Sequence, residues 1–379
     1  MYTIKLDNPL AGFTASSAKK GEKVKLITRE FSSSEDGDLF IQRLEGLNEI
    51  INLLPKNITP STISHLLVLI HKDGTCNVYV NELEFIGTMK TKKNKINKGD
   101  PVYIDDIADI ETLMIKDVII PENVGIMFLF SHGWRKGLYF DLTHISNPDY
   151  LLNYNLKVTL GHYLNYLFFQ DLYKITNDDW EKLYSSKWFP FIGLKKKTID
   201  NILSYIRSNW NPDELLDEIE IEVKKSLPSF IEKWEKDNLF NEHIELIKHA
   251  NERFINNDYI SSTSILYPRI EGILRIVNKE NNSNNYKQME LSKAPTKRMQ
   301  IQENRYSRIL PDKFQQYLTK VYFAKFNPDE PADISRNSLG HGVVKHIDFS
   351  KKSTILGFLI IEQLYNHKPV ENSDNLISF

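Results

Sequence analysis

The spacing of apolar residues changes near residue 146, and this change is the feature that most constrains the fold. Before it, short runs alternate apolar and polar residues, which is typical of half-buried strands. The runs 66–70 and 77–80, and then 124–130 and 137–142, flank turn residues and predict two hairpins. After it, apolar residues recur every three or four positions, as on one face of a helix. The sequence therefore predicts an α+β fold.

We expect three parts in this chain of 379 residues, a length that suits two or three domains. Residues 1–146 are expected to form a strand-rich mixed α/β domain with one helix at 38–54 and a sensor or regulatory role. Residues 147–238 are expected to form a helical linking region. Residues 239–379 are expected to form a helical bundle, because amphipathic helices joined by short links pack in this way. Its main predicted helices are 242–254, 258–277, 311–326 and 353–365.

Composition excludes several classes of protein. The net charge of −2 means that the chain as a whole is not a basic nucleic-acid binder, so any nucleic-acid surface is local. One cysteine, Cys76, can form neither an internal disulfide nor a cysteine-based zinc site, which favours a cytoplasmic setting. No apolar run reaches the ~18–20 residues that span a bilayer. Neither a phosphate-binding Gly-Lys-Ser/Thr loop nor a His-Glu-x-x-His zinc motif is present, and we expect no cofactor and no metal.

One constellation has residue types suited to catalysis. Arg336 and His341 form an Arg-x4-His pair, with Asn337 directly after the arginine and Gly342 directly after the histidine. Metal-free RNA cleavage needs a base for the 2′-hydroxyl and an acid for the leaving 5′-oxygen. Histidine performs either role, because its ordinary pKa of ~6.5 lies near neutral pH. A planar guanidinium suits the equatorial oxygens of the phosphorane.

Helix geometry limits how these residues can meet. Positions 336 and 341 diverge by about 140° on a straight helix, whereas 337 and 341 share a face. Asn337 is therefore predicted to orient the imidazole. Gly340 and Gly342 weaken the helix, and a break there would return Arg336 toward His341. The alternative is a surface arginine and a capping histidine at a helix junction.

The predicted bundle, with SRNSLGHG between its last long helices, resembles a HEPN domain. The segment 265–275, ILYPRIEGILR, is similar to the second helix of such domains in bacterial defence and toxin proteins. The resemblance covers residues 240–366, about one third of the chain; residues 1–235 resemble no family that we recognise. It implies a ribonuclease with Arg336, Asn337 and His341 as catalytic residues and Glu271 in support. Glu271 has an alternative role as an ion-pair partner of Arg275, four residues along the helix.

Basic residues gather just before the motif. Residues 291–326 carry eight basic and two acidic side chains, a net charge of +6. This strip predicts RNA contacts, although a solvated helix face explains each residue equally well. The basic members are Lys293, Lys297, Arg298, Arg305, Arg308, Lys313, Lys320 and Lys325, with Lys297, Arg298, Arg305 and Arg308 as the RNA-binding candidates. A second basic run, 90–98, predicts either a phosphate-contacting loop or, more simply, a solvated one.

The expected function is that of a metal-independent RNA endonuclease that leaves 2′,3′-cyclic phosphate ends. The resemblance implies an anti-phage defence or toxin effector, controlled by a regulatory partner protein or a phage-derived trigger. One chain supplies one Arg-x4-His pair, whereas cleavage needs an acid and a base, so we expect a homodimer through the bundle. The alternative is a non-catalytic HEPN-like module that dimerises or binds a nucleotide or a partner.

Overall fold

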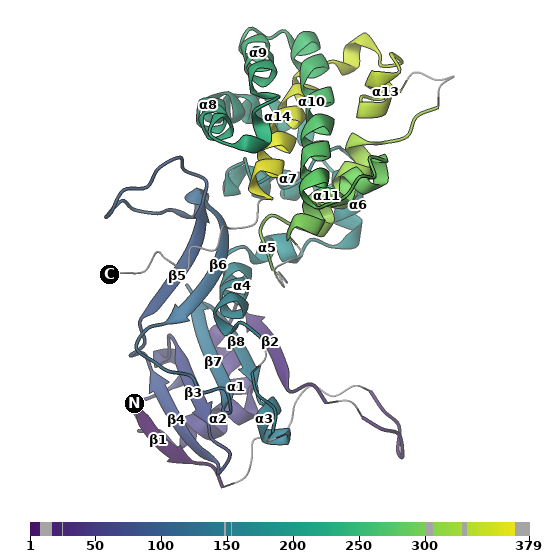
Figure 1. The fold of residues 1–379 in the computed structure, drawn as a ribbon. Coiled ribbons are helices and arrows are strands. Elements are labelled where there is room, and N and C mark those ends of the chain that lie inside the picture. The colour runs from purple at the N-terminus through teal and green to yellow at the C-terminus, as the bar shows by residue number, and fades with distance from the viewer. Residues whose placement is uncertain are drawn as a thin grey trace. The chain divides into compact units, whose positions relative to one another are not determined.

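We analysed a computed structural model of the chain (Figure 1). The structure describes residues 1–7, 17–24, 26–147, 149–152, 154–299, 306–327 and 332–367. The chain forms two compact units. The sheet unit comprises Met1–Met89 and Ile110–Gln170, and the helical unit comprises Lys90–Asp109 and Asp171–Phe379. An antiparallel sheet precedes a set of helices, so the predicted α+β class is confirmed. The division into three domains stays a prediction.

The sheet unit is built on a six-stranded sheet with the order β1-β4-β3-β7-β8-β2, in which neighbouring strands run antiparallel. Its strands are β1 (Tyr2–Lys5), β2 (Arg29–Ser34), β3 (Leu66–Ile70), β4 (Thr75–Val80), β7 (Gly125–His132) and β8 (Arg135–Asp141). The β3–β4 and β7–β8 pairs confirm both predicted hairpins. A separate two-stranded sheet pairs β5 (Phe85–Thr91) with β6 (Ile107–Ile115).

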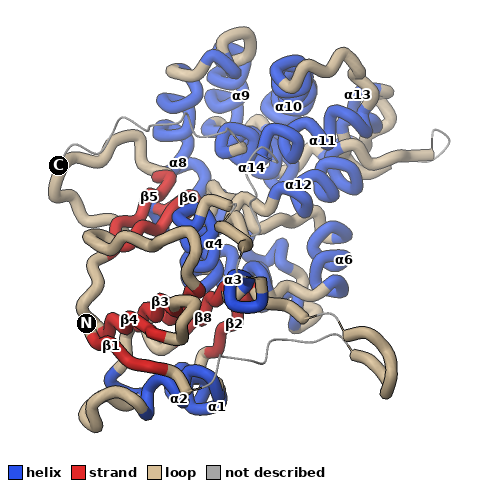
Figure 2. Tube along the Cα trace, turned by 60° about the horizontal axis from the view of Figure 1, so that its bottom comes forward, coloured by secondary structure: helices blue, strands red, loops and turns tan. Residues whose placement is uncertain are grey.

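Helices cover both faces of this sheet. The helices α1 (Gly37–Arg43) and α2 (Glu45–Asn52) lie along one face, as the blue and red segments of Figure 2 show. Their apolar side chains are buried against that face. On the other face, α4 (Leu156–Phe168) stacks Tyr163 on Phe31 of β2 at 4.1 Å between ring centroids. The single helix expected at 38–54 is two helices, because Leu44 has an extended backbone between them.

The helical unit has α10 (Tyr259–Glu280) at its centre, packed against α9 (Ile244–Ile255), α11 (Gln288–Met299) and α14 (Lys351–Asn366). Helix α8 (Leu216–Glu235) packs against α9 and α14. No helix in the described ranges is both long enough and apolar enough to cross a membrane. The remaining helical segments are α3 (Thr143–Ser146), α5 (Gln170–Tyr173), α6 (Asn177–Ser185), α7 (Lys196–Arg207), α12 (Pro311–Tyr317), α13 (Arg336–Gly340) and the short turns η1 (Pro60–Thr62), η2 (Ile104–Asp106), η3 (Pro212–Leu215), η4 (Asn238–Phe240), η5 (Leu318–Tyr322) and η6 (His346–Asp348).

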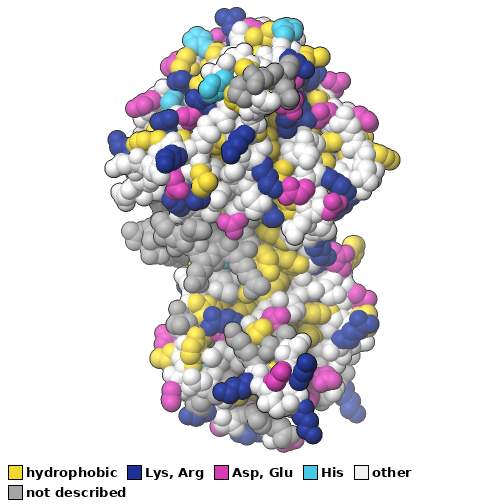
Figure 3. Space-filling view, turned by 90° about the vertical axis from the view of Figure 1, so that its right-hand side faces the viewer, with side chains coloured by type: hydrophobic (Ala, Val, Ile, Leu, Met, Phe, Trp, Pro, Cys, Tyr) yellow, Lys and Arg dark blue, Asp and Glu magenta, His cyan; other side chains and the backbone are white. Residues whose placement is uncertain are grey.

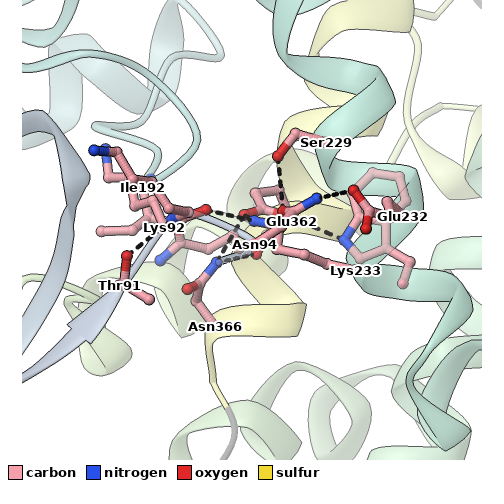
Figure 4. Close-up of polar contacts among 12 residues, drawn as sticks. Thr91, Lys92, Asn94, Ile192, Ser229, Glu232, Lys233, Glu362 and Asn366 are labelled. Carbon is pink, nitrogen blue, oxygen red and sulfur yellow. Dashed lines mark hydrogen bonds and ion pairs between the residues drawn. The ribbon is translucent and has the colours of Figure 1, made fainter. Parts of the chain in front are cut away.

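Residues 90–109 comprise the end of β5, the segment that links it to β6 and the start of β6. They belong to the helical unit, where a buried polar cluster holds them (Figure 4). Glu362 of α14, only 1% exposed, accepts hydrogen bonds from Lys233 at 2.8 Å and from the Trp234 indole at 3.0 Å. Lys233 also donates to the Lys92 carbonyl, and the Lys92 ammonium donates to the Leu194 carbonyl at 3.0 Å. Burial lowers the pKa of Lys92 well below its usual range. The start of the basic run is therefore anchored in protein rather than solvated.

Candidate functional site

The Arg-x4-His pair lies at the two ends of the short helix α13. Ser335 caps its N-terminus by accepting a hydrogen bond from the Ser338 backbone N–H at 3.1 Å, and the Ser338 hydroxyl accepts one from the Ser335 N–H at 2.8 Å. Arg336 is the first helical residue and His341 is the C-cap. Gly342 follows with φ of +71°, a left-handed conformation that glycine adopts without steric cost. The sequence thus starts and stops the helix within the motif itself.

A carboxylate on the central helix α10 holds the arginine of the motif. The Arg336 Nε donates a hydrogen bond to Oε2 of Glu271, and Arg275 Nη2 donates to Oε1 at 2.6 Å. Glu271 is 7% exposed, so the carboxylate is largely buried between two cations. Burial, with Glu271 nearby, raises the pKa of Tyr322 well above its usual range, and the Tyr322 hydroxyl donates to the Tyr267 carbonyl. Glu271 therefore pairs with Arg275, as the four-residue spacing predicts, and also contacts Arg336, whereas its supporting role in catalysis stays a prediction.

Gly340 lets the guanidinium fold back along α13. A Cβ atom added at Gly340 would clash with Arg336 Nη1, which shows that the guanidinium crosses directly over this glycine. His341 is the next residue in the chain. Of the three guanidinium nitrogens of Arg336, only Nε makes a hydrogen bond to a described residue. The two terminal amino groups are left for a ligand. The Arg336 side chain thus reaches the C-terminal end of α13 by its own length, along a helix that stays unbroken from Arg336 to Gly340.

Asn337 positions the helix rather than the histidine. Its side-chain amide donates to the carbonyls of Phe323 at 3.0 Å and Ala324 at 3.3 Å and exchanges hydrogen bonds with Gln288. The prediction that it orients the His341 imidazole is wrong, because its side-chain partners lie on these other segments. The helix expected at 311–326 ends early, and its last carbonyls need partners outside the helix.

The early end of that helix comes from a change of helix type. Helix α12 continues as a π-helical turn, η5, and the chain leaves it at Phe323. Phe326 then lies outside the helix and packs against the His341 ring with 5.3 Å between centroids. The His341 side chain is exposed and has no hydrogen-bond partner among the residues that the structure describes. The predicted helix at 311–326 includes Phe326, because helical spacing alone does not reveal a π turn.

The predicted RNA-binding residues differ in their surroundings. Lys297 is 42% exposed and pairs with Glu290 at 2.8 Å. Arg298 belongs to α11, but its side chain lies outside the described residues, as does the whole of Arg305. An exposed aromatic that the sequence analysis missed lies near the site: the Arg275 guanidinium is 5.3 Å from the centre of the Tyr286 ring.

Arg308 does not fit the prediction that it binds RNA. It is 2% exposed, its backbone N–H donates to Asp109 at 3.0 Å, and its guanidinium donates to the Ile107 carbonyl. Burial lowers the pKa of this guanidinium to about 10. A side chain enclosed in this way cannot contact RNA, so the prediction for Arg308 is wrong. Asp109 is distant in sequence, and a local charge count contains no signal of this burial.

Comparisons with known proteins do not assign this chain to a family. No protein-family model matches this chain, and no curated protein or solved structure was found to be similar to it. Within the described ranges, no group of three or more His, Cys, Asp or Glu side chains is placed to hold a metal ion. The resemblance to HEPN domains stays a hypothesis that rests on the residues above.

Proposed function

We propose that the helical unit is a metal-independent RNA endonuclease of HEPN type. One observation carries this proposal: Glu271 holds Arg336 by Nε, one of its terminal amino groups lies over Gly340, and the exposed His341 is the next residue in the chain. An arginine fixed at one nitrogen and open at the others suits a phosphate, because a guanidinium pairs with two phosphate oxygens at once. A histidine without a structural hydrogen bond is open to exchange protons with a substrate.

The reaction uses the 2′-hydroxyl of the RNA as nucleophile. A histidine takes the 2′-proton as the 2′-oxygen bonds to phosphorus, and the terminal amino groups of Arg336 bind the equatorial oxygens of the phosphorane. The bond from phosphorus to the 5′-oxygen then breaks, and an acid protonates that oxygen. The products are a 2′,3′-cyclic phosphate and a 5′-hydroxyl. His341 supplies one of the two proton transfers.

The second proton transfer motivates a homodimer. We propose that two chains pair through their helical units and place two copies of Arg336 and His341 in one groove. Light scattering on protein at micromolar concentration is expected to give twice the chain mass of 44.2 kDa. A monomer that still cleaves RNA would contradict the composite site and would require another acid, with the nearby His346 as the first candidate.

A substrate with one altered nucleotide tests the function. Purified protein in excess EDTA is expected to cut a single-stranded RNA and to leave cyclic phosphate ends. A single 2′-deoxynucleotide at the cleaved position removes the nucleophile and is expected to abolish the cut there, while the same change two nucleotides away serves as the control. Cleavage that ignores the deoxy substitution would contradict the mechanism. Tight RNA binding with no cleavage would support the alternative, a non-catalytic binding module.

The cellular role follows from the resemblance and is part of the same proposal. We propose an anti-phage defence or toxin effector whose activity a partner protein or a phage-derived trigger controls. Slowed growth on expression of the wild-type chain, with normal growth on expression of His341→Ala, would support an RNA-degrading effector. Equal growth with both chains under phage infection would contradict a defence role.

A further inference from the structure

A basic pocket lies directly beside the motif. It has a volume of about 370 Å³ and is lined from α6 and Lys187, from the end of η5, and from the two chain segments on either side of residues 328–331. Three lysines line it, Lys187, Lys320 and Lys325, together with one acid, Asp333. A pocket of ~300–1,000 Å³ is the usual size for a small-molecule site. Figure 3 shows Lys and Arg side chains on this side of the helical unit, where α6, α11 and α13 lie.

The pocket and the motif share residues. Phe326 lines the pocket and also packs on the His341 ring at 5.3 Å between centroids. Ser335 lines the pocket and directly precedes Arg336 in the chain. A strand of RNA with its scissile phosphate at Arg336 therefore has an aromatic side chain and then a basic pocket in its path. Aromatic side chains bind unpaired bases by stacking, and lysines bind the phosphates between them.

The charges in the pocket are unequally neutralised. Lys187 pairs with Asp333 at 2.9 Å, and Lys320 pairs with Glu181 at 2.6 Å. Lys325 is exposed and has no ion-pair partner among the described residues. The Asp333 side chain is 79% exposed, so water screens its pair with Lys187 and a phosphate can displace it. Lys325 is thus the cation most available to a ligand, and Asp333 is the group that opposes an anion.

We propose that this pocket binds a nucleotide of single-stranded RNA that flanks the scissile phosphate, with Lys325 and Lys187 on its phosphate and Phe326 against its base. The proposal rests on the ribonuclease function above and adds the path of the substrate. It also assigns opposite effects to two residues of one pocket. Loss of Lys325 weakens RNA binding, and loss of the Asp333 charge strengthens it.

Binding of an uncleavable RNA tests the pocket separately from catalysis. The probe is a fluorescent hexanucleotide whose 2′-hydroxyls are all methylated, followed by anisotropy over a series of salt concentrations. Lys325→Glu is expected to weaken binding about tenfold, as expected for loss of a hydrogen bond to a charged group. It is also expected to reduce the slope of the logarithm of the binding constant against the logarithm of salt concentration by about 0.7 per lost phosphate contact. Asp333→Asn is expected to tighten binding severalfold. Lys279→Glu, on the exposed last turn of α10, is the matched control with no expected change.

The outcomes separate the two proposals. If wild-type protein cleaves ordinary RNA but Lys325→Glu binds the probe as Lys279→Glu does, the pocket assignment is wrong and the ribonuclease stands. If Lys325→Glu selectively loses the probe but wild-type protein cuts no RNA, the ribonuclease is wrong and the pocket stands. Unlabelled RNA and polyglutamate of the same total charge are then compared as competitors of the probe. If polyglutamate displaces the probe as well as RNA does, the assignment to RNA is overturned, because a site for RNA also binds the base.

Discussion

Glu362 and Glu271 are two buried carboxylates of the helical unit that each bind more than one side chain, and their surroundings differ. Glu362 is 1% exposed, and its ion-pair partner Lys233 has a side chain only 7% exposed. Glu271 is also buried, but its partners Arg275 and Arg336 have side chains that are 48% and 31% exposed. The first cluster is enclosed by protein. The second has its carboxylate in the protein and its cations at the surface.

This difference separates a structural cluster from a site suited to chemistry. The side chains that donate to Glu362 form their hydrogen bonds with oxygens of the protein. Together with the contact between Lys92 and Leu194, they hold residues 90–109 against the helices. At Glu271, the guanidinium of Arg336 is fixed at one nitrogen and keeps its other donors for a ligand. We therefore expect substitutions at the first cluster to change stability and substitutions at the second to change activity.

Glu362→Ala is expected to have the largest effect on stability. Removal of the carboxylate leaves the Lys233 ammonium buried without its ion partner, which costs about 3–5 kcal/mol. Urea denaturation followed by tryptophan fluorescence measures it, because Trp180, Trp188, Trp210 and Trp234 all lie in the helical unit. Glu245→Ala is the control, since Glu245 lies outside this cluster, pairs with Lys248 at the surface and contributes ~0–1 kcal/mol. Equal losses in the two variants would contradict the comparison.

Glu271→Ala is expected to cost much less stability, about 1 kcal/mol, because both arginines can turn into water. Its effect is expected on RNA cleavage instead, as Arg336 loses its fixed direction and the rate falls by about 10²-fold. Glu271→Gln keeps an oxygen that can accept from Arg336 Nε and is expected to restore part of the rate. A cleavage rate in Glu271→Ala equal to that of wild type would show that the contact is only structural.

Gly340→Ala is expected to leave stability nearly unchanged and still reduce cleavage. The added Cβ displaces the Arg336 guanidinium, while alanine suits a helix better than glycine by about 0.5–1 kcal/mol. Gly342→Ala is the opposite case, because residue 342 has φ of +71° and open space around its Cα. It is expected to lower stability by about 1 kcal/mol without moving Arg336. Denaturation midpoints and initial cleavage rates of the two variants, measured together, test this contrast.

The sequence predicted those parts of the fold and site that depend on local patterns. Turn residues between short apolar runs located both hairpins, and the Arg-x4-His spacing with its two glycines located the motif and the end of its helix. The pair between Glu271 and Arg275 followed from their four-residue spacing, whereas the link of Glu271 to the motif was implied only by the resemblance to HEPN domains. For the hairpins, the motif and this pair, the signal lies within a few residues of the feature.

The rest depends on contacts between residues far apart in the chain. Arg308 and Lys92 belong to basic runs, yet both are enclosed by segments that are remote in sequence. The pocket gathers Lys187 with Lys320 and Lys325, and only the last two were in the predicted basic strip. The π turn before Phe326 has no sequence signal, because the apolar spacing there fits an ordinary helix. Burial and helix type at these positions follow from packing.

The rate of RNA cleavage by His341→Ala in EDTA tests the central claim most directly. The side chain is exposed and makes no hydrogen bond within the described residues, so the variant is expected to denature at the wild-type midpoint. Its cleavage rate is expected to fall by about 10³-fold, the scale of a lost acid or base. His249→Ala, which removes a histidine that is 65% exposed on α9, is expected to cleave at the wild-type rate. Cleavage by His341→Ala at the rate of His249→Ala would contradict the assignment of this site.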